Sequence, residues 1–199
     1  FPVNASLNEI AAHYTAEPND GTIVKEGDVL KIDIGVHVDG YIADTAVTVC
    51  YDPKHDSMVK SAEAALAESV RMAKVGTKAS DIGKVIETII SRMGYRPIQN
   101  LSGHSLEQYT IHAGKSIPNI RTIGSSFTLQ PGEAYAIEPF ATSKDGAGVV
   151  HEGKVKNIFG ITSRKPSKDK DADELLNTIW SRYKSLPFAL RWLTDAYEE

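Results

Sequence analysis

The chain has 199 residues, 41% of them hydrophobic, which is enough to bury the core of a globular domain. Its 22 basic and 26 acidic residues give a net charge of −4, and Lys and Arg form no dense cluster, so nucleic acid is not expected as a partner. The single cysteine, Cys50, cannot form an internal disulfide, and no apolar run is long enough to span a bilayer. These features predict a cytoplasmic protein.

The first strong pattern is a β-hairpin. Residues 30–34 and 43–47 alternate in the way that half-buried strands do, and they flank Asp39-Gly40, a dipeptide typical of two-residue hairpin turns. If Val38 lies opposite Tyr41, the rest of the register is fixed.

This register brings two acids together. Gly35 faces Asp44 and Asp33 faces Ala46, so both carboxylates lie on one face of the hairpin as diagonal cross-strand neighbours. The reverse face carries mostly apolar residues, which predicts a buried sheet surface: Ile32, Ile34, Val36, Ala43, Thr45 and Val47.

Helices are expected after the hairpin and near the C-terminal end. Apolar residues recur at helical spacing in two segments, Met58, Ala62, Leu66, Val70 and Ala73, and then Ile82, Val85, Ile86, Ile89 and Met93. Ser80 is a candidate N-cap and Gly94 a candidate C′ residue for the second helix. Short strands are expected over residues 99–140. A charged linker, residues 167–173, then leads into a helix containing Leu175, Leu176, Ile179 and Trp180.

An internal repeat indicates two related halves. Residues 26–33, EGDVLKID, match residues 131–138, PGEAYAIE, and the match pairs Asp33 with Glu138. Upstream, residues 97–102 resemble residues 2–7. A helix precedes Pro97 but none precedes Pro2, so the symmetry predicts a chain cut at its N-terminal end.

These acids predict a metal centre. Two carboxylates held close together repel one another unless a cation neutralises them. The repeat adds Glu138, and His104 follows a glycine-containing break in the sequence, which gives three carboxylates and one imidazole. An oxygen-rich set of this kind suits divalent Mn, Fe, Co or Zn in a two-metal site. A lone histidine is more often a surface residue than a ligand, and we keep that interpretation for His37, His55 and His151.

Six motifs, in order and spacing, closely resemble the type 2 methionine aminopeptidases, especially archaeal ones: AAHYT (11–15), KIDIG (31–35), ADTA (43–46), NLSGH (100–104), IHAGK (111–115) and AIEPF (136–140). The resemblance covers nearly the whole chain. It implies the pita-bread fold, an α/β (α+β) architecture in which two pseudo-symmetric halves close around a metal pair. By this resemblance residues 1–160 form the catalytic core and residues 161–199 begin the helical insertion of type 2 enzymes.

The resemblance also implies roles for individual residues. Asp33, Asp44, His104 and Glu138 are expected to be metal ligands, with Asp44 bridging two divalent ions (Co, Mn, Fe or Zn). His13 and His112 resemble the catalytic histidines near the substrate amide, and together with Phe1 and Ile111 they are expected to bind the substrate. The implied reaction is removal of the N-terminal methionine of nascent proteins by a two-metal-activated water, carried out by a monomer without membrane or nucleic acid.

One departure from the family is visible. The family has a fifth ligand, a Glu on a strand near the C-terminus, and neither Glu198 nor Glu199 stands in a matching context. The sequence therefore predicts a chain cut at its C-terminal end as well. Two other functions remain open: a prolidase-type peptidase, and a non-catalytic homologue that uses this fold to bind protein or RNA.

Overall fold

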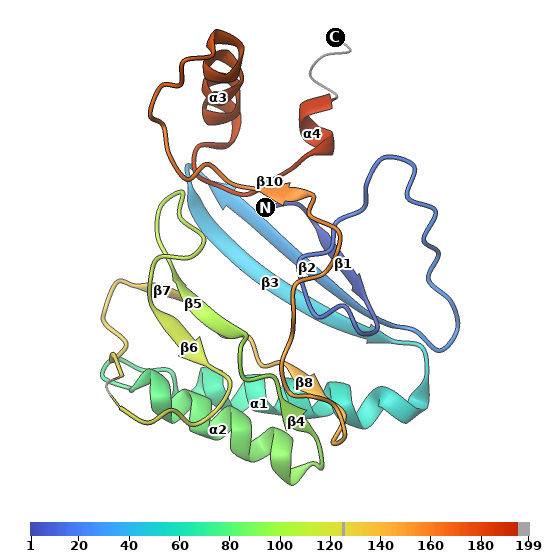
Figure 1. The fold of residues 1–199 in the computed structure, drawn as a ribbon. Helices are drawn as coiled ribbons and strands as arrows, with labels where there is room; N and C mark the ends of the chain where they lie inside the picture. The colour runs from blue at the N-terminus through green and yellow to red at the C-terminus, as the bar shows by residue number, and fades with distance from the viewer. Residues whose placement is uncertain (125, 195–199) are drawn as a thin grey trace.

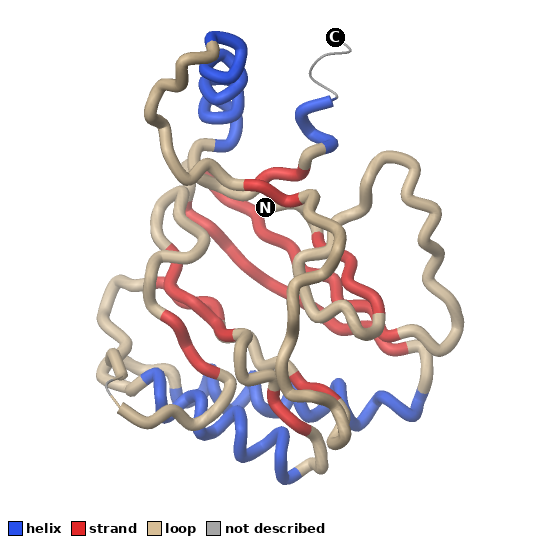
Figure 2. The backbone as a smooth tube through the Cα atoms, in the orientation of Figure 1, coloured by secondary structure: helices blue, strands red, loops and turns tan. Residues whose placement is uncertain are grey.

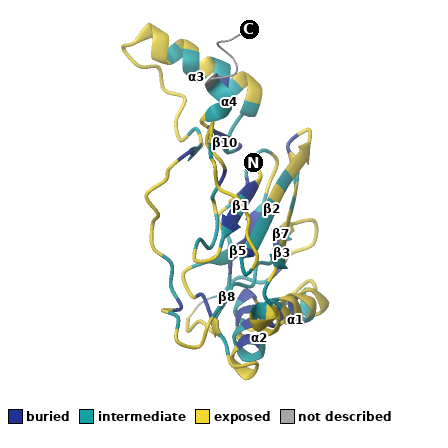
Figure 3. Ribbon diagram, turned by 90° about the vertical axis from the view of Figure 1, so that its right-hand side faces the viewer, coloured by how far each residue is buried: buried dark blue, intermediate teal, exposed yellow. Residues whose placement is uncertain are grey.

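The computed structural model describes residues 1–124 and 126–194, which form a mixed α/β fold (Figure 1). A sheet crosses the middle, α1 and α2 lie side by side at one end, and α3 and α4 lie at the opposite end (Figures 1 and 3). Long loops join several of the helices and strands (Figure 2). The central sheet has the order β1-β2-β3, with bounds Asn4–Leu7, Val29–Val38 and Tyr41–Cys50.

The hairpin of β2 and β3 has the predicted register. Val38 lies opposite Tyr41, Gly35 opposite Asp44 and Asp33 opposite Ala46. Asp39 and Gly40 have positive φ values of 50° and 87°, and this backbone twist joins neighbouring antiparallel strands through a two-residue loop. The turn therefore fixes which residues share a face, and both aspartates lie on the same one.

The prediction that the reverse face of this hairpin is buried is wrong. Val36 is 61% exposed and Val47 is 55% exposed. A groove between β3 and α1 borders the opposite face of the hairpin, because its lining includes Lys31 and Asp33 of β2 and Leu66 of α1. On the apolar face, Ile34 and Val38 are also 38% and 77% exposed, so among the described residues no element covers it.

The main hydrophobic core lies between the two long helices and the second half of the chain. The predicted helices are confirmed as α1 (Asp56–Met72), which follows a short 3-10 helix (Pro53–His55), and α2 (Ala79–Arg92). On α2, three isoleucines at helical spacing are fully buried: Ile82, Ile86 and Ile90. On α1, the buried residues that face α2 are small: Ser61, Ala65 and Ser69. The apolar stripe predicted on α1 instead lines the groove, where Val70 is 57% exposed.

Of the two predicted caps of α2, one is correct. Gly94 has a φ of 88°, and the Tyr95 amide donates to the Ile90 carbonyl at 3.1 Å, which closes the helix in a Schellman arrangement. Ser80 is not the N-cap, because the helix begins at Ala79. The Ser80 amide instead donates to the Ser126 hydroxyl at 2.9 Å, so a distant loop satisfies this end of the helix.

The second half repeats the strand pairing of the first. A sheet of order β6-β5-β7 contains Ser116–Pro118, Ser102–Leu106 and Ala134–Ala136, and β5 runs antiparallel to β7 as β1 does to β2. His104 lies opposite Ala136 and Ser6 opposite Lys31. Because Ala136 and Lys31 are equivalent in the repeat, His104 corresponds to Ser6. The upstream sequence match, which paired Ser6 with Leu101, is therefore wrong by three residues.

The remaining elements lie at the edges of the two halves. β4 (Arg96–Pro97) pairs with β8 (Ala141–Thr142), and β9 (Ile158–Phe159) pairs with β10 (Phe188–Ala189). The helix predicted near the C-terminal end is α3 (Lys170–Tyr183), and a short α4 spans Arg191–Thr194. The predicted linker is too long, because Asp169 caps the helix and the last four linker residues, 170–173, are helical. Within the described part of the chain, no helix combines the length and apolar character needed to cross a bilayer. Glu198 and Glu199 lie outside the described residues.

Candidate metal centre

The two halves of the fold bring the predicted ligands to one cavity of about 840 Å³. Asp33 comes from β2 and Asp44 from β3, whereas His104 comes from β5 and Glu138 follows β7. Each half therefore contributes two of the four side chains. The convergence expected from the hairpin and the repeat is what the structure shows.

Three of these side chains approach one another closely. Ligand atoms of Asp44, His104 and Glu138 all lie within 4.8 Å of each other. His104 Nε2 lies 3.0 Å from Glu138 Oε1 and 3.6 Å from Asp44 Oδ2, and the His104 and Asp44 side chains are only 10% and 9% exposed. Asp33 lines the same cavity outside this tight group, and its Oδ2 accepts a hydrogen bond from Asn4 Nδ2 at 3.2 Å.

The charges at this cavity are not balanced by the chain itself. Burial, followed by repulsion from Glu138 and Asp33, raises the pKa of Asp44 from 3.8 to about 6. Burial also raises the pKa of Asp33. For His104, burial lowers the pKa, but the hydrogen bond to Glu138 and the nearby negative charges outweigh it and raise the pKa overall. Carboxylate oxygens and one imidazole nitrogen with excess negative charge form a donor set that fits a divalent cation.

Two further histidines border the ligands. The rings of His112 and His104 meet edge to face at 88° with centroids 4.4 Å apart. Burial, and then the positive charge of His104 and His13, lowers the pKa of His112. His13 lines the cavity from a loop residue with a φ of 63°. His37 instead packs against Tyr109, and neither His55 nor His151 lines this cavity.

Phe1 and Ile111 also line the cavity, as predicted. The Phe1 ring lies directly over Gly35, where an added Cβ would come within 2.2 Å of two ring carbons. Gly35 therefore leaves the space that the ring occupies. The sequence reasoning missed Asn4, which is 3% exposed and bonds to Asp33. Its place opposite Asp33 in the β1–β2 ladder depends on long-range pairing, and no local signal predicts that.

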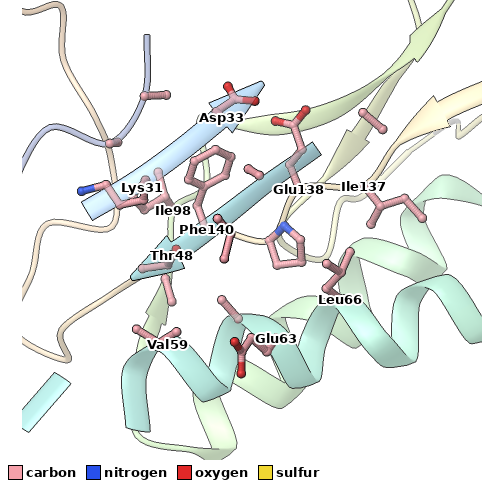
Figure 4. A pocket seen from close by; sticks show the side chains of 18 of the residues that line it. Lys31, Asp33, Thr48, Val59, Glu63, Leu66, Ile98, Ile137, Glu138 and Phe140 are labelled. Atoms are coloured by element: carbon pink, nitrogen blue, oxygen red, sulfur yellow. The ribbon is translucent and has the colours of Figure 1, made fainter. Parts of the chain in front are cut away.

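A second and larger cavity of about 1350 Å³ adjoins the first (Figure 4). It is the groove between β3 and α1 described above, and it shares three acids with the smaller cavity: Asp33, Asp44 and Glu138. Figure 4 shows Asp33 and Glu138 along one side and Val59, Glu63 and Leu66 of α1 along the other. The carboxylates thus stand at the boundary of two cavities.

Residues 1–161 match the family model described as metallopeptidase family M24. The chain belongs to this family. The chain is 49% identical to a methionine aminopeptidase of Pyrococcus horikoshii over 199 residues. The match covers 100% of this chain and 67% of the relative. It is 44% identical to that of Methanocaldococcus jannaschii over 193 residues, 97% of this chain and 65% of the relative. Within this hydrolase family it belongs with the methionine aminopeptidases, which confirms the resemblance seen in the motifs.

Solved structures confirm the pita-bread fold for this M24 chain. The methionine aminopeptidase of Thermotoga maritima matches with a TM-score of 0.64 and 28% identity, over 70% of this chain and 56% of that chain. A thermophilic Arx1 matches with a TM-score of 0.75 over 96% of this chain and 60% of that chain, and at 15% identity this likeness concerns the fold alone. The M24 chain spans about two thirds of the length of the curated relatives it matches.

Proposed function

We propose that the protein to which this chain belongs removes the N-terminal methionine from newly made proteins, and that four side chains of this chain are ligands of two divalent cations: Asp33, Asp44, His104 and Glu138. The observation that carries the proposal is the meeting of three ligand atoms within 4.8 Å at a cavity formed by both halves of the fold. We propose Co, Mn, Fe or Zn as the ions, because such ligands suit them. When bound, the ions supply Lewis acidity and an activated water.

The cavity also offers a place for the amino-terminal residue of a polypeptide. Its carboxylates attract a positively charged α-amino group, whereas Phe1 and the buried Ile111 present an apolar surface to the first side chain. A thioether packs favourably against an aromatic ring, and this supports methionine as the first residue. The substrate binds through its free amino terminus, which accounts for an exopeptidase.

The two histidines are assigned to the peptide bond. The lowered pKa of His112 keeps its imidazole neutral near pH 7, and a neutral imidazole can both donate and accept hydrogen bonds. We propose that His112 and His13 bind the amide that is cleaved and stabilise the charge that develops on its carbonyl oxygen. Neither is proposed as a metal ligand.

The wider assignment follows the same family relationship. We propose that residues 1–160 form the catalytic core and that residues 161–199 begin a helical insertion. We further propose that the protein acts as a monomer in the cytoplasm on nascent chains. A prolidase-type activity or a binding function without catalysis would be the alternative outcome of the experiment below.

The experiment compares hydrolysis of Met-Ala-Ser with that of a proline-containing dipeptide, with and without added Co(II) or Mn(II), alongside elemental analysis of the protein. We expect methionine to be released from Met-Ala-Ser when metal is present, and we expect no hydrolysis of the proline-containing dipeptide. The variant Asp44→Ala should lose bound metal and activity together, whereas Asp145→Ala, which alters an exposed loop carboxylate, should retain both. Cleavage of only the proline dipeptide, or stoichiometric metal without any hydrolysis, would contradict the proposal.

A further inference from the structure

His13 has a backbone conformation that needs support from outside its own loop. Its φ of 63° lies in the left-handed region, which L-residues other than glycine adopt at a cost in free energy. The side chain is exposed to the cavity rather than fixed by burial. A residue keeps such a conformation only where contacts with the surrounding structure hold the chain next to it in place.

The chain is held directly after His13. The β1 strand binds the next residue, because the Ala5 amide donates to the Tyr14 carbonyl at 2.7 Å. One residue further on, Thr15 is only 1% exposed. Arg191 Nη1 donates to the Thr15 hydroxyl at 2.8 Å and to the Ala16 carbonyl at 2.6 Å.

A second side chain from the same region completes the support. Asn157 is 4% exposed, and its Nδ2 donates to the Thr15 carbonyl in a buried hydrogen bond. Thr15 is therefore bonded through both its side chain and its main chain. Both donors come from parts of the sequence far beyond the His13 loop.

Asn157 and Arg191 are themselves fixed to one another. Asn157 precedes β9 and Arg191 follows β10 by two residues, and these strands pair with Ala189 opposite Ile158. The Leu190 amide donates to the Asn157 carbonyl at 2.9 Å, which extends the ladder to the two supporting residues. In Figures 1 and 3, β10 lies near the N-terminus of the chain. The β9–β10 pair is thus a small clamp at the ends of the segment that contains α3.

We propose that Asn157 and Arg191 are positioning residues for His13, acting through Thr15. The inference rests on the proposed function of His13 at the substrate amide. It assigns a task to the C-terminal segment: the β9–β10 clamp sets the direction in which the His13 imidazole enters the cavity. Loss of the Arg191 hydrogen bonds should release the loop, let His13 return toward ordinary backbone angles and move its ring away from the substrate.

The test uses Arg191→Met, which keeps the length of the side chain but removes its donors, with Arg164→Met as the matched control. The Arg164 Cζ lies 4.3 Å from the centroid of the Trp180 ring of α3, so its replacement perturbs the same segment while the Arg191 hydrogen bonds to Thr15 and Ala16 remain. Kinetics on Met-Ala-Ser and elemental analysis are combined with NMR of protein labelled at histidine Cε1, in which the His13 signal is identified by its loss in His13→Ala.

In Arg191→Met we expect a shifted or broadened His13 signal, an unchanged His151 signal, unchanged metal content and a kcat lower by roughly tenfold to a hundredfold. Arg164→Met should leave the His13 signal and kcat unchanged. Should Arg191→Met fail to fold, Thr15→Val removes the hydroxyl acceptor while keeping the shape of the side chain, and a smaller shift of the same signal is expected.

The two proposals fail in different ways. If the unaltered protein does not hydrolyse Met-Ala-Ser, the proposed function is wrong, and the NMR shift alone then decides whether Arg191 positions His13. An unshifted His13 signal in folded Arg191→Met would overturn the inference. It would also be overturned if Arg164→Met produced the same loss of kcat and the same shift, because the effect would then be general destabilisation.

Discussion

Replacing Asp44 by asparagine should stabilise the metal-free protein at neutral pH while abolishing metal binding. Asp44 is 9% exposed and carries a charge that burial, Glu138 and Asp33 disfavour. Its pKa rises from 3.8 to about 6, and at about 1.4 kcal/mol for each pH unit this difference corresponds to about 3 kcal/mol of lost stability above pH 6. Asparagine has a similar shape and no charge, so it avoids this cost.

The sign of the pH dependence follows from the raised pKa. Between pH 3.8 and about 6 the folded protein holds a proton on Asp44 that the unfolded chain has released, so the free energy of unfolding falls as the pH rises through this range. The free energy of unfolding of Asp44→Asn should therefore be higher than that of the original protein by up to about 3 kcal/mol at pH 7.5. At pH 4 the two values should differ little.

The assay is urea unfolding followed by circular dichroism in the presence of EDTA at both pH values. Asp145→Asn serves as the matched control, because it removes a carboxylate from an exposed loop and should change the free energy of unfolding at neither pH. A variant that is equally stable or less stable than the original protein at pH 7.5 would refute the reasoning, since it would mean that Asp44 carries no unbalanced charge in the folded state.

Two further predictions concern the substrate side of the cavity. His112→Ala should retain its metal, measured by elemental analysis, while kcat falls about a hundredfold, the usual effect of removing one transition-state donor. Loss of metal in this variant would instead make His112 a ligand. Gly35→Ala should raise KM for Met-Ala-Ser roughly tenfold, because the new methyl group pushes the Phe1 ring into the space for the first side chain, as steady-state kinetics would show. An unchanged KM would mean that the Phe1 ring does not border that space.

The part of the centre that the sequence predicts well is the part that depends on short-range geometry. A two-residue Asp39-Gly40 turn leaves a single register for the strands beside it, and this register puts Asp33 and Asp44 on one face. The repeat extends the argument to Glu138, because a similar pattern of residues precedes it and the second half pairs β5 with β7 as the first half pairs β1 with β2. Local chemistry and periodicity are sufficient for these positions.

The errors and omissions arise where distant parts of the chain meet. Ser80 is a residue type common at N-caps, but the helix begins before it, and the Ser126 hydroxyl of a distant loop accepts the hydrogen bond of the Ser80 amide. The apolar face containing Val36 has the pattern of a buried strand, and burial depends on what covers it rather than on its own sequence. Asn157 follows a polar, exposed stretch, residues 151–156. Nothing in the neighbouring sequence predicts that its side-chain amide donates to the carbonyl of Thr15, 142 residues earlier in the chain.

The clamp that holds Thr15 also determines when the His13 loop can assemble during synthesis. Its bonds join residues separated by 142 and 176 positions, and contacts of such long separation form late because the intervening chain must first be ordered. On the ribosome, the hairpin with Asp33 and Asp44 can fold long before Arg191 has been translated. A nascent copy therefore carries two of its acids early but lacks the hydrogen bonds of Arg191 to the His13 loop until Arg191 emerges.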